Sequence, residues 1–245
     1  DPSEVIEFSH RSISGILLIV TLLIFIKSRK ISKGSIARRT VNFLTFFVVF
    51  EAAIGAVIVL YEWVGLNSSL PRIIAVPIHL VNTFGLLASY AILYKILLNN
   101  FKNINQLWDR RFIFVAFLFL LSGATGSITA LADVLFPSSS FYEGLMEDFD
   151  RTSELLTRLR ILHPVVASGL SAVLIIESRK IKKDYKIDVK FLQLLVIIAV
   201  TLGIMNVLFN IVLFLSIFHL AIADLLWITY IYVSMDKIKN KSAIN

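Results

Sequence analysis

The chain has 245 residues, of which 57% are hydrophobic and 17% are charged, and its mean hydropathy is +0.82, which is typical of a protein embedded in a lipid bilayer and excludes an ordinary soluble domain. The net charge of +7 is divided among short basic clusters between apolar runs, a pattern that indicates membrane orientation, so we expect no nucleic-acid partner. Cysteine is absent, which excludes disulfides, thiolate metal sites and cysteine nucleophiles.

Apolar runs of about 20 residues, the length that crosses the hydrocarbon core of a bilayer, recur along the whole chain. They predict transmembrane helices at 10–27, 40–61, 75–98, 112–132, 160–177, 191–214 and 218–235. The predicted fold class is therefore an all-α, polytopic membrane helical bundle with seven transmembrane helices in this sequence. The loop between the fourth and fifth spans is long enough to form a surface helix that covers the second half of the bundle.

The joining segments alternate between high and low content of Lys and Arg. The rich segments are 27–39 and 178–190 with six each, 95–111 with four, and the tail after Met235 with three. The poor segments are 1–9, 62–74, the acidic loop 143–154 and a short turn near Ser216. Because basic loops stay on the cytoplasmic side, we expect a multi-pass protein of the cell (plasma) membrane, with its N-terminus outside and its C-terminus in the cytoplasm.

The sequence holds four histidines, each at or near the start of a span that is predicted to run from outside to inside. They are His10, His79, His163 and His219. A single such histidine is most often an interfacial or satisfied core residue. Four at one depth are harder to explain in that way, because ionisable side chains inside a membrane are costly and usually functional. Imidazoles that project inward from facing helices are one way in which proteins hold haem iron.

The surroundings of the histidines indicate an internal repeat. Ser14-Gly15 follows His10 as Ser168-Gly169 follows His163, while His79 and His219 both begin an "HL" pair. We therefore predict two pseudo-repeated four-helix units: an N-terminal half-bundle at 1–110 and a C-terminal half-bundle at 111–245. This repeat needs one more helix before Asp1, so we expect the first helix of the N-terminal unit to be missing from this sequence.

The repeat pairs His10 with His79 and His163 with His219, and each pair is able to clamp one planar macrocycle. Zinc is a poor alternative, because it takes three or four ligands and no HExxH or clustered histidine spacing is present. The two halves differ in charge. Glu7 stands three residues before His10, and residues three apart share a helix face, whereas Arg160 stands three residues before His163. A surface salt bridge from Glu7 to Arg11 is the alternative explanation.

The stretch "IEFSHRSISGILLIV" resembles the IE-x-x-HR signature of the haem A synthase family. The later "HL" helix, the "LRILHPVVASG" helix and the final "FHLA" helix match the remaining histidine segments of that family in order. The resemblance implies an eight-helix membrane enzyme, a haem-dependent oxidoreductase that oxidises a methyl group of haem O to the formyl group of haem A for terminal oxidase assembly. The chain departs from many relatives because it lacks the cysteine pairs of their outer loops.

Carried over by residue, the resemblance implies that His10 and His79 hold the iron of the substrate haem O and that Glu7 is the catalytic carboxylate. It implies that His163 and His219 are the axial ligands of a haem b cofactor. The partners that it implies are haem O and haem A, the lipid bilayer, a haem O synthase and terminal oxidase assembly factors.

Several assignments stay open at this stage. Arginines near the outer face are candidates for partners of haem propionates or of lipid headgroups: Arg11, Arg72, Arg158 and Arg160. Glu51 and Asp224 lie inside spans, either as proton-path residues or as polar groups facing the bundle interior. The rival functions are a di-haem b-type electron-transfer protein, which needs no chemical difference between the halves, and a proton-coupled transporter.

Overall fold

The structure of the chain is a computed structural model, and it describes residues 2–101, 103–209 and 213–244. Its secondary structure in these ranges is helical, with no strand. The helices are α1 (Pro2–Ser28), α2 (Ile36–Leu60), α3 (Leu70–Asn99), the short 3-10 helix η1 (Asn105–Trp108), α4 (Arg110–Leu135), α5 (Phe141–Phe149), α6 (Leu155–Leu159), α7 (Leu162–Tyr185), α8 (Lys190–Leu208) and α9 (Leu213–Ile244).

Seven helical segments of the described ranges are long and apolar enough to cross a membrane, judged by length and composition. The first four are α1, α2, α3 and α4. The fifth is formed by α6 and α7 together, and the last two are α8 and α9. Helices satisfy their own backbone hydrogen bonds, which is the condition for crossing lipid. The prediction of an all-α polytopic membrane bundle is therefore confirmed.

The last turn of the bundle differs from the prediction. The helix α8 ends at Leu208 and α9 begins at Leu213, so Ser216 lies inside α9 and the predicted turn at that position is wrong. The Ser216 hydroxyl instead donates a hydrogen bond of 3.2 Å to Asn206 Oδ1 of α8. Between Leu208 and Leu213 the sequence has one polar residue, Asn210, and Ser216 follows soon after, so hydropathy does not decide between the two positions.

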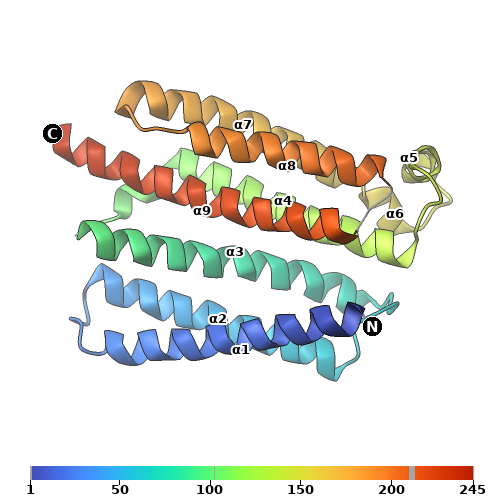
Figure 1. Cartoon of the computed structure of the whole chain (residues 1–245), viewed down its shortest axis with the longest axis horizontal. Helices are drawn as coiled ribbons and strands as arrows, with labels where there is room; N and C mark the ends of the chain where they lie inside the picture. The colour runs from blue at the N-terminus through green and yellow to red at the C-terminus, as the bar shows by residue number, and fades with distance from the viewer. Residues whose placement is uncertain (1, 102, 210–212, 245) are drawn as a thin grey trace.

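The long helices lie side by side, and the two ends of the bundle differ (Figure 1). One end, which we call the α5 end, carries the start of α1, the α2–α3 connection, α5 and α6. The opposite end carries the α1–α2, α3–α4 and α7–α8 connections and the end of α9. All the basic segments identified in the sequence lie at this opposite end. The four helices that carry histidine, α1, α3, α7 and α9, all begin at the α5 end.

An aromatic core joins α3, α4 and α9. The Trp227 ring of α9 lies 4.8 Å from Phe119 of α4 and 6.2 Å from Phe84 of α3, centroid to centroid. The indole Nε1 of Trp227 donates a hydrogen bond of 2.9 Å to the backbone carbonyl of Phe84. Since buried indole groups need such an acceptor, this bond fixes α9 against α3. Helix α3 therefore shares a core with α4 and α9, while α1 and α2 pack with α3 in a separate hydrophobic cluster.

Ion pairs hold the C-terminal part of α9 at the opposite end. Lys237 Nζ lies 2.6 Å from Asp109, the N-cap of α4, and Lys95 of α3 pairs with Asp236. Burial opposes ionisation of Asp109, but hydrogen bonds from Lys237 and from the Phe112 N–H outweigh it, so the pKa of Asp109 lies below its ordinary value. The three helices of the aromatic core are thus also tied together by charge.

The closest approach in this core makes a testable prediction. A Cβ added at Gly123 of α4 would overlap Cε2 of Phe84 and lie 3.2 Å from its Cδ2, and Phe84 is buried in the aromatic core. We expect Gly123→Ala to destabilise the bundle by about 1–3 kcal/mol through overpacking. Thermal unfolding in detergent checks this. Gly169→Ala is the matched control, because nothing lies within 4 Å of a Cβ there; equal losses in the two variants would contradict the prediction.

Candidate functional site

The four histidines form two pairs at the α5 end. The rings of His10 on α1 and His79 on α3 have centroids 6.4 Å apart and planes at 81°. The rings of His163 on α7 and His219 on α9 have centroids 6.2 Å apart and planes at 87°. The structure thus brings together the same partners that the sequence repeat pairs, and it gives both pairs nearly the same geometry.

This spacing fits two ligands of one metal. Two imidazoles that bind a metal from opposite sides, each through a nitrogen about 2 Å away, have ring centres about 6 Å apart. Within the described ranges, no group of three or more His, Cys, Asp or Glu side chains converges. Each pair therefore offers two nitrogens, a set suited to a metal that brings its other ligands with it, as haem iron does.

A glycine on the neighbouring helix lies against three of these histidines. A Cβ at Gly126 of α4 would lie 2.9 Å from Cε1 of His163, and one at Gly203 of α8 would lie 3.3 Å from Cε1 of His219. A Cβ at Gly55 of α2 would lie 3.9 Å from Cε1 of His79. The absence of a side chain at Gly126 and Gly203 allows the imidazole to rest against the helix backbone, whereas a Cβ at Gly55 would make an ordinary van der Waals contact.

The contact at Gly126 also determines which nitrogen of His163 is available. Nδ1 of His163 donates a hydrogen bond of 3.1 Å to the backbone carbonyl of Ser122, four residues before Gly126. With Nδ1 occupied, Nε2 is the nitrogen left to bind a ligand. Nδ1 of His219 is buried and has no hydrogen-bond partner within the described ranges. The backbone of Ala199 interacts with this histidine.

In the first half, a carboxylate stands beside the histidine. Oε2 of Glu51 on α2 lies 3.6 Å from Nδ1 of His79, and Glu51 is 19% exposed. The amide of Asn82 and the hydroxyl of Thr83, both on α3, donate hydrogen bonds of 2.5 Å to the two oxygens of this carboxylate. Glu51 therefore faces the bundle interior, as one of the two interpretations of the sequence expected.

Glu7, the predicted catalytic carboxylate, lies on α1 one turn before His10. Its side chain is 56% exposed and pairs with Arg11, which is equally exposed. His10 is itself an exposed residue, whereas His79, His163 and His219 are half-buried. The first pair is therefore the more accessible of the two.

Asp224 lies five residues after His219 on α9. Its Oδ1 is buried and has no hydrogen-bond partner among the residues that the structure describes. The position is inside the bundle, as expected, but no contact ties it to a histidine. Asp224 is thus a polar residue of the bundle interior.

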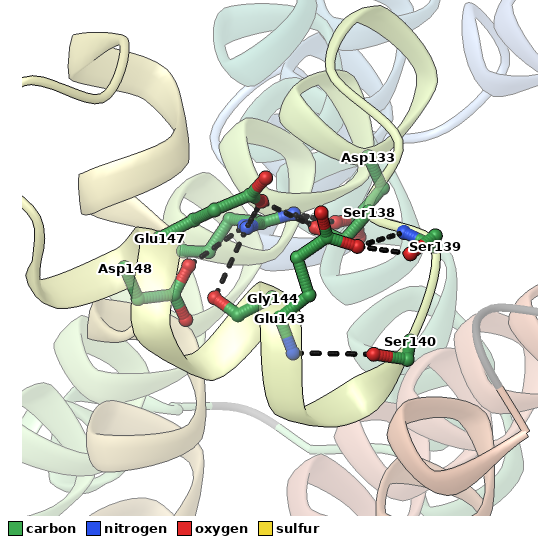
Figure 2. A network of polar contacts seen from close by, with 9 residues as sticks. Asp133, Ser138, Ser139, Ser140, Glu143, Gly144, Glu147 and Asp148 are labelled. Carbon is green, nitrogen blue, oxygen red and sulfur yellow. Dashed lines mark hydrogen bonds and ion pairs between the residues drawn. The ribbon is translucent and has the colours of Figure 1, made fainter.

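Arg160 has a structural role that the sequence analysis did not foresee. Its Nε lies 2.8 Å from Asp148, and its Nη1 and Nη2 each lie 3.2 Å from Asp133 and Glu147 respectively. The guanidinium also donates to Ser138 Oγ and to a backbone carbonyl of α5. Figure 2 shows Asp133 on α4 together with Glu147 and Asp148 of α5 in this network. Its donors are occupied, so the prediction of a propionate partner is not supported for Arg160.

The network fixes the surface helix predicted over the second half. Burial raises the pKa of Asp148 above its ordinary value, although the hydrogen bond and charge of Arg160 act in the opposite direction. Arg160 is 7% exposed and stands three residues before His163. The other arginines differ: Arg72 donates to the carbonyls of Gly65 and Asn67, and Nε of Arg158 is buried without a partner within the described ranges.

The sequence analysis missed the glycines and the pairing of Glu51 with His79. A signal was present, because Gly55, Gly126 and Gly203 all lie in the second half of a helix that runs toward the α5 end. The pairing of Glu51 with His79 joins α2 to α3, and sequence spacing identifies neighbouring residues only within one helix.

Comparison with known proteins places these features in context. The family model for a cytochrome oxidase assembly protein, COX15-CtaA, matches residues 2–231. Two similar proteins, from two strains of Thermus thermophilus, are both named protoheme IX farnesyltransferase. Each is 28% identical over 245 residues, which cover 96% of this chain and 40% of the relative's own length. No solved structure matches the chain.

The Arg160 network makes the second prediction. Removal of the guanidinium leaves the buried carboxylate of Asp133 without its partner, so we expect Arg160→Ala to lower stability by about 3–5 kcal/mol and to loosen α5. Limited proteolysis should then cleave between 137 and 155 faster than in the unsubstituted protein. Arg151→Ala, at an exposed position of the same loop, is the control. Unchanged cleavage in Arg160→Ala would show that the network does not hold α5.

Proposed function

The chain belongs to the family of cytochrome oxidase assembly proteins, and we propose that it is a haem A synthase, a membrane oxidoreductase that converts the methyl group of haem O to the formyl group of haem A. The observation that carries this proposal is the presence of two histidine pairs, 6.4 Å and 6.2 Å between ring centroids, at one end of the bundle. Two equivalent pairs suit an enzyme that holds one haem as substrate and another as cofactor.

We assign the substrate haem O to His10 and His79. The exposed position of His10 suits a ligand that must enter as haem O and leave as haem A. Acidic side chains stand near this pair, namely Glu7 one turn away and Glu51 beside His79. The predicted N-terminal half-bundle, 1–110, is on this view the reactive half.

We assign a resident haem b to His163 and His219 of the half-bundle 111–245. Both residues are half-buried, and Arg160, three residues before His163, holds the helix α5. Haem b, held there by His163 and His219, would supply one-electron redox chemistry. The hydrogen bond from His163 Nδ1 to the Ser122 carbonyl would keep Nε2 directed to the iron.

Glu7 is proposed to act on the substrate. Oxidation of a methyl group, with its electrons passed to an external acceptor, releases protons, and it develops positive charge where the route is cationic. A nearby carboxylate is able to accept a proton or to stabilise such charge. Its pairing with Arg11, one turn further along α1, holds the carboxylate on the part of the helix that carries His10.

We further propose that the N-terminus faces outward and the C-terminus the cytoplasm of a cell (plasma) membrane, because the basic segments gather at the end opposite α5. Haem O synthase and terminal oxidase assembly factors are the proposed protein partners. The names of the two relatives support a link to haem, but this chain spans 40% of their length, so farnesyl transfer is not carried over to it.

One extraction experiment separates this proposal from its rivals. Pigments extracted from the purified protein should contain one haem b per chain and a variable amount of haem O or haem A. Two equal, unchanged b haems would favour the di-haem electron-transfer protein, and an absence of haem would favour the transporter. Conversion of added haem b and farnesyl diphosphate to haem O would instead favour the activity named in the relatives.

The assignment of the two haems makes the third prediction. His163→Ala or His219→Ala should remove the tightly held haem b and leave the exchangeable haem, because each substitution deletes one axial ligand. His10→Ala should give the reverse pattern. Haem stoichiometry by extraction measures both. Loss of only the exchangeable haem in the His163→Ala protein would reverse the assignment.

The role of Glu7 makes the fourth prediction. Glu7→Gln keeps the shape of the side chain and removes its charge, so we expect a folded protein that retains haem b and accumulates haem O or a partly oxidised form. A loss of general-base assistance typically slows a reaction by about 10²–10⁴-fold. The haem A to haem O ratio is measured in cells with this variant as the sole copy. Glu62→Gln, at an exposed residue of the α2–α3 loop, is the control. An unchanged ratio in Glu7→Gln would leave Glu7 as a surface salt-bridge partner.

A further inference from the structure

The three glycine contacts share a register that identifies an equivalent position on three helices. The residue four positions before each glycine is Ser122 for Gly126, Ala199 for Gly203 and Glu51 for Gly55. In α4 the backbone carbonyl of this residue accepts the hydrogen bond from His163 Nδ1. Residues four apart lie on one face of a helix, so the position before each glycine is directed toward the same histidine as the glycine itself.

Only in α2 is this position acidic. The Glu51 carboxylate lies 3.6 Å from Nδ1 of His79, which is an ion-pair distance and not yet a hydrogen bond. This buried Nδ1 has no hydrogen-bond partner within the described ranges, so Glu51 is placed to become its acceptor. At the equivalent place α4 offers His163 a backbone carbonyl. Its orientation is determined from the other side, because Asn82 and Thr83 on α3 bind its two oxygens. Asn82 also donates a hydrogen bond of 2.9 Å to the carbonyl of Phe47, which links it to α2. The carboxylate is thus held in place by the helix that carries His79.

We propose that Glu51 is a positioning residue of the first site that acts through His79. As the acceptor for Nδ1–H, it fixes Nε2 as the nitrogen that binds the substrate iron. Its charge gives the first site a lower reduction potential than the second. The inference rests on the proposed assignment of haem O to His10 and His79. The two acidic residues then have different roles: Glu7 acts on the substrate haem, and Glu51 acts on His79, the residue that binds its iron.

The physical argument concerns the strength of the acceptor. A carboxylate that accepts from one imidazole nitrogen increases the electron donation of the other nitrogen to a metal, and it does so more strongly than a neutral carbonyl. A negative charge near iron also favours the ferric over the ferrous state. His163 has only a carbonyl at the equivalent place, and Ala199 supplies no side-chain acceptor to His219. The acidic position therefore distinguishes the two sites through the ligand.

The test uses two backgrounds of the full chain in detergent, each loaded with haem b as the probe. His163→Ala leaves the first site, and His10→Ala leaves the second. Glu51→Gln, which has nearly the same shape, is introduced into both backgrounds, and the midpoint potential is measured by spectroscopic redox titration. Potential reports on the ligand and does not depend on turnover. Thr83→Val, which removes one hydrogen bond to Glu51, is the milder second variant.

We expect Glu51→Gln to raise the potential of the first site, with haem content unchanged. A roughly tenfold change in the preference for ferric over ferrous haem corresponds to about 59 mV in a one-electron couple. Thr83→Val should move the potential in the same direction by less, and the second site should not respond. An unchanged potential at a loaded first site, or equal shifts at both sites, would overturn the inference while the proposed function stands. A failure of the His163→Ala protein to bind haem would instead overturn the haem assignment itself, and this inference with it.

Discussion

The close contact between a glycine and an imidazole is the interaction on which the His163–His219 site depends. A ring placed inside a bilayer must have its polar nitrogens satisfied within the protein, because no water is present to do so. A helical carbonyl already accepts one backbone hydrogen bond and has a second lone pair, but side chains ordinarily cover it. At Gly126 that cover is absent, and His163 reaches the carbonyl of Ser122. The contact at Gly203 is also tight, because a Cβ there would lie 3.3 Å from His219, whereas one at Gly55 would lie 3.9 Å from His79, an ordinary van der Waals distance.

The core determines how the two sites lie relative to each other. Helices α3 and α9 each carry one histidine of a different pair, and they meet where Trp227 donates its hydrogen bond to the carbonyl of Phe84. Aromatic rings of α4 fill the space beside this bond, and α4 also carries the glycine that supports His163. The packing of α3 against α9 therefore couples the position of His79 to that of His219.

The sequence was sufficient for the class of fold, because apolar runs and basic clusters reflect the cost of polar groups in lipid, which acts on each helix separately. It also identified the four histidines, since their depth follows from their position along each span. It did not place the connection between α8 and α9, because Asn210 and Ser216 are isolated polar residues in one long apolar stretch and hydropathy does not choose between them. Nor did it reveal that Arg160 binds three carboxylates or that Glu51 stands beside His79, because these contacts depend on how neighbouring helices are rotated against each other.

The two histidine sites have similar geometry but differ in the charge beside them. Both have a histidine pair with nearly the same spacing and a glycine behind at least one ring. At the position four residues before that glycine, α8 has Ala199, which adds no desolvation cost, whereas α2 has Glu51, a carboxylate at 19% exposure. A buried ion costs several kcal/mol unless other groups compensate it. Asn82 and Thr83 provide that compensation, and an alanine would make both unnecessary. The Glu51 carboxylate, retained beside Nδ1 of His79 despite this cost, is better explained by its effect on that histidine than by packing.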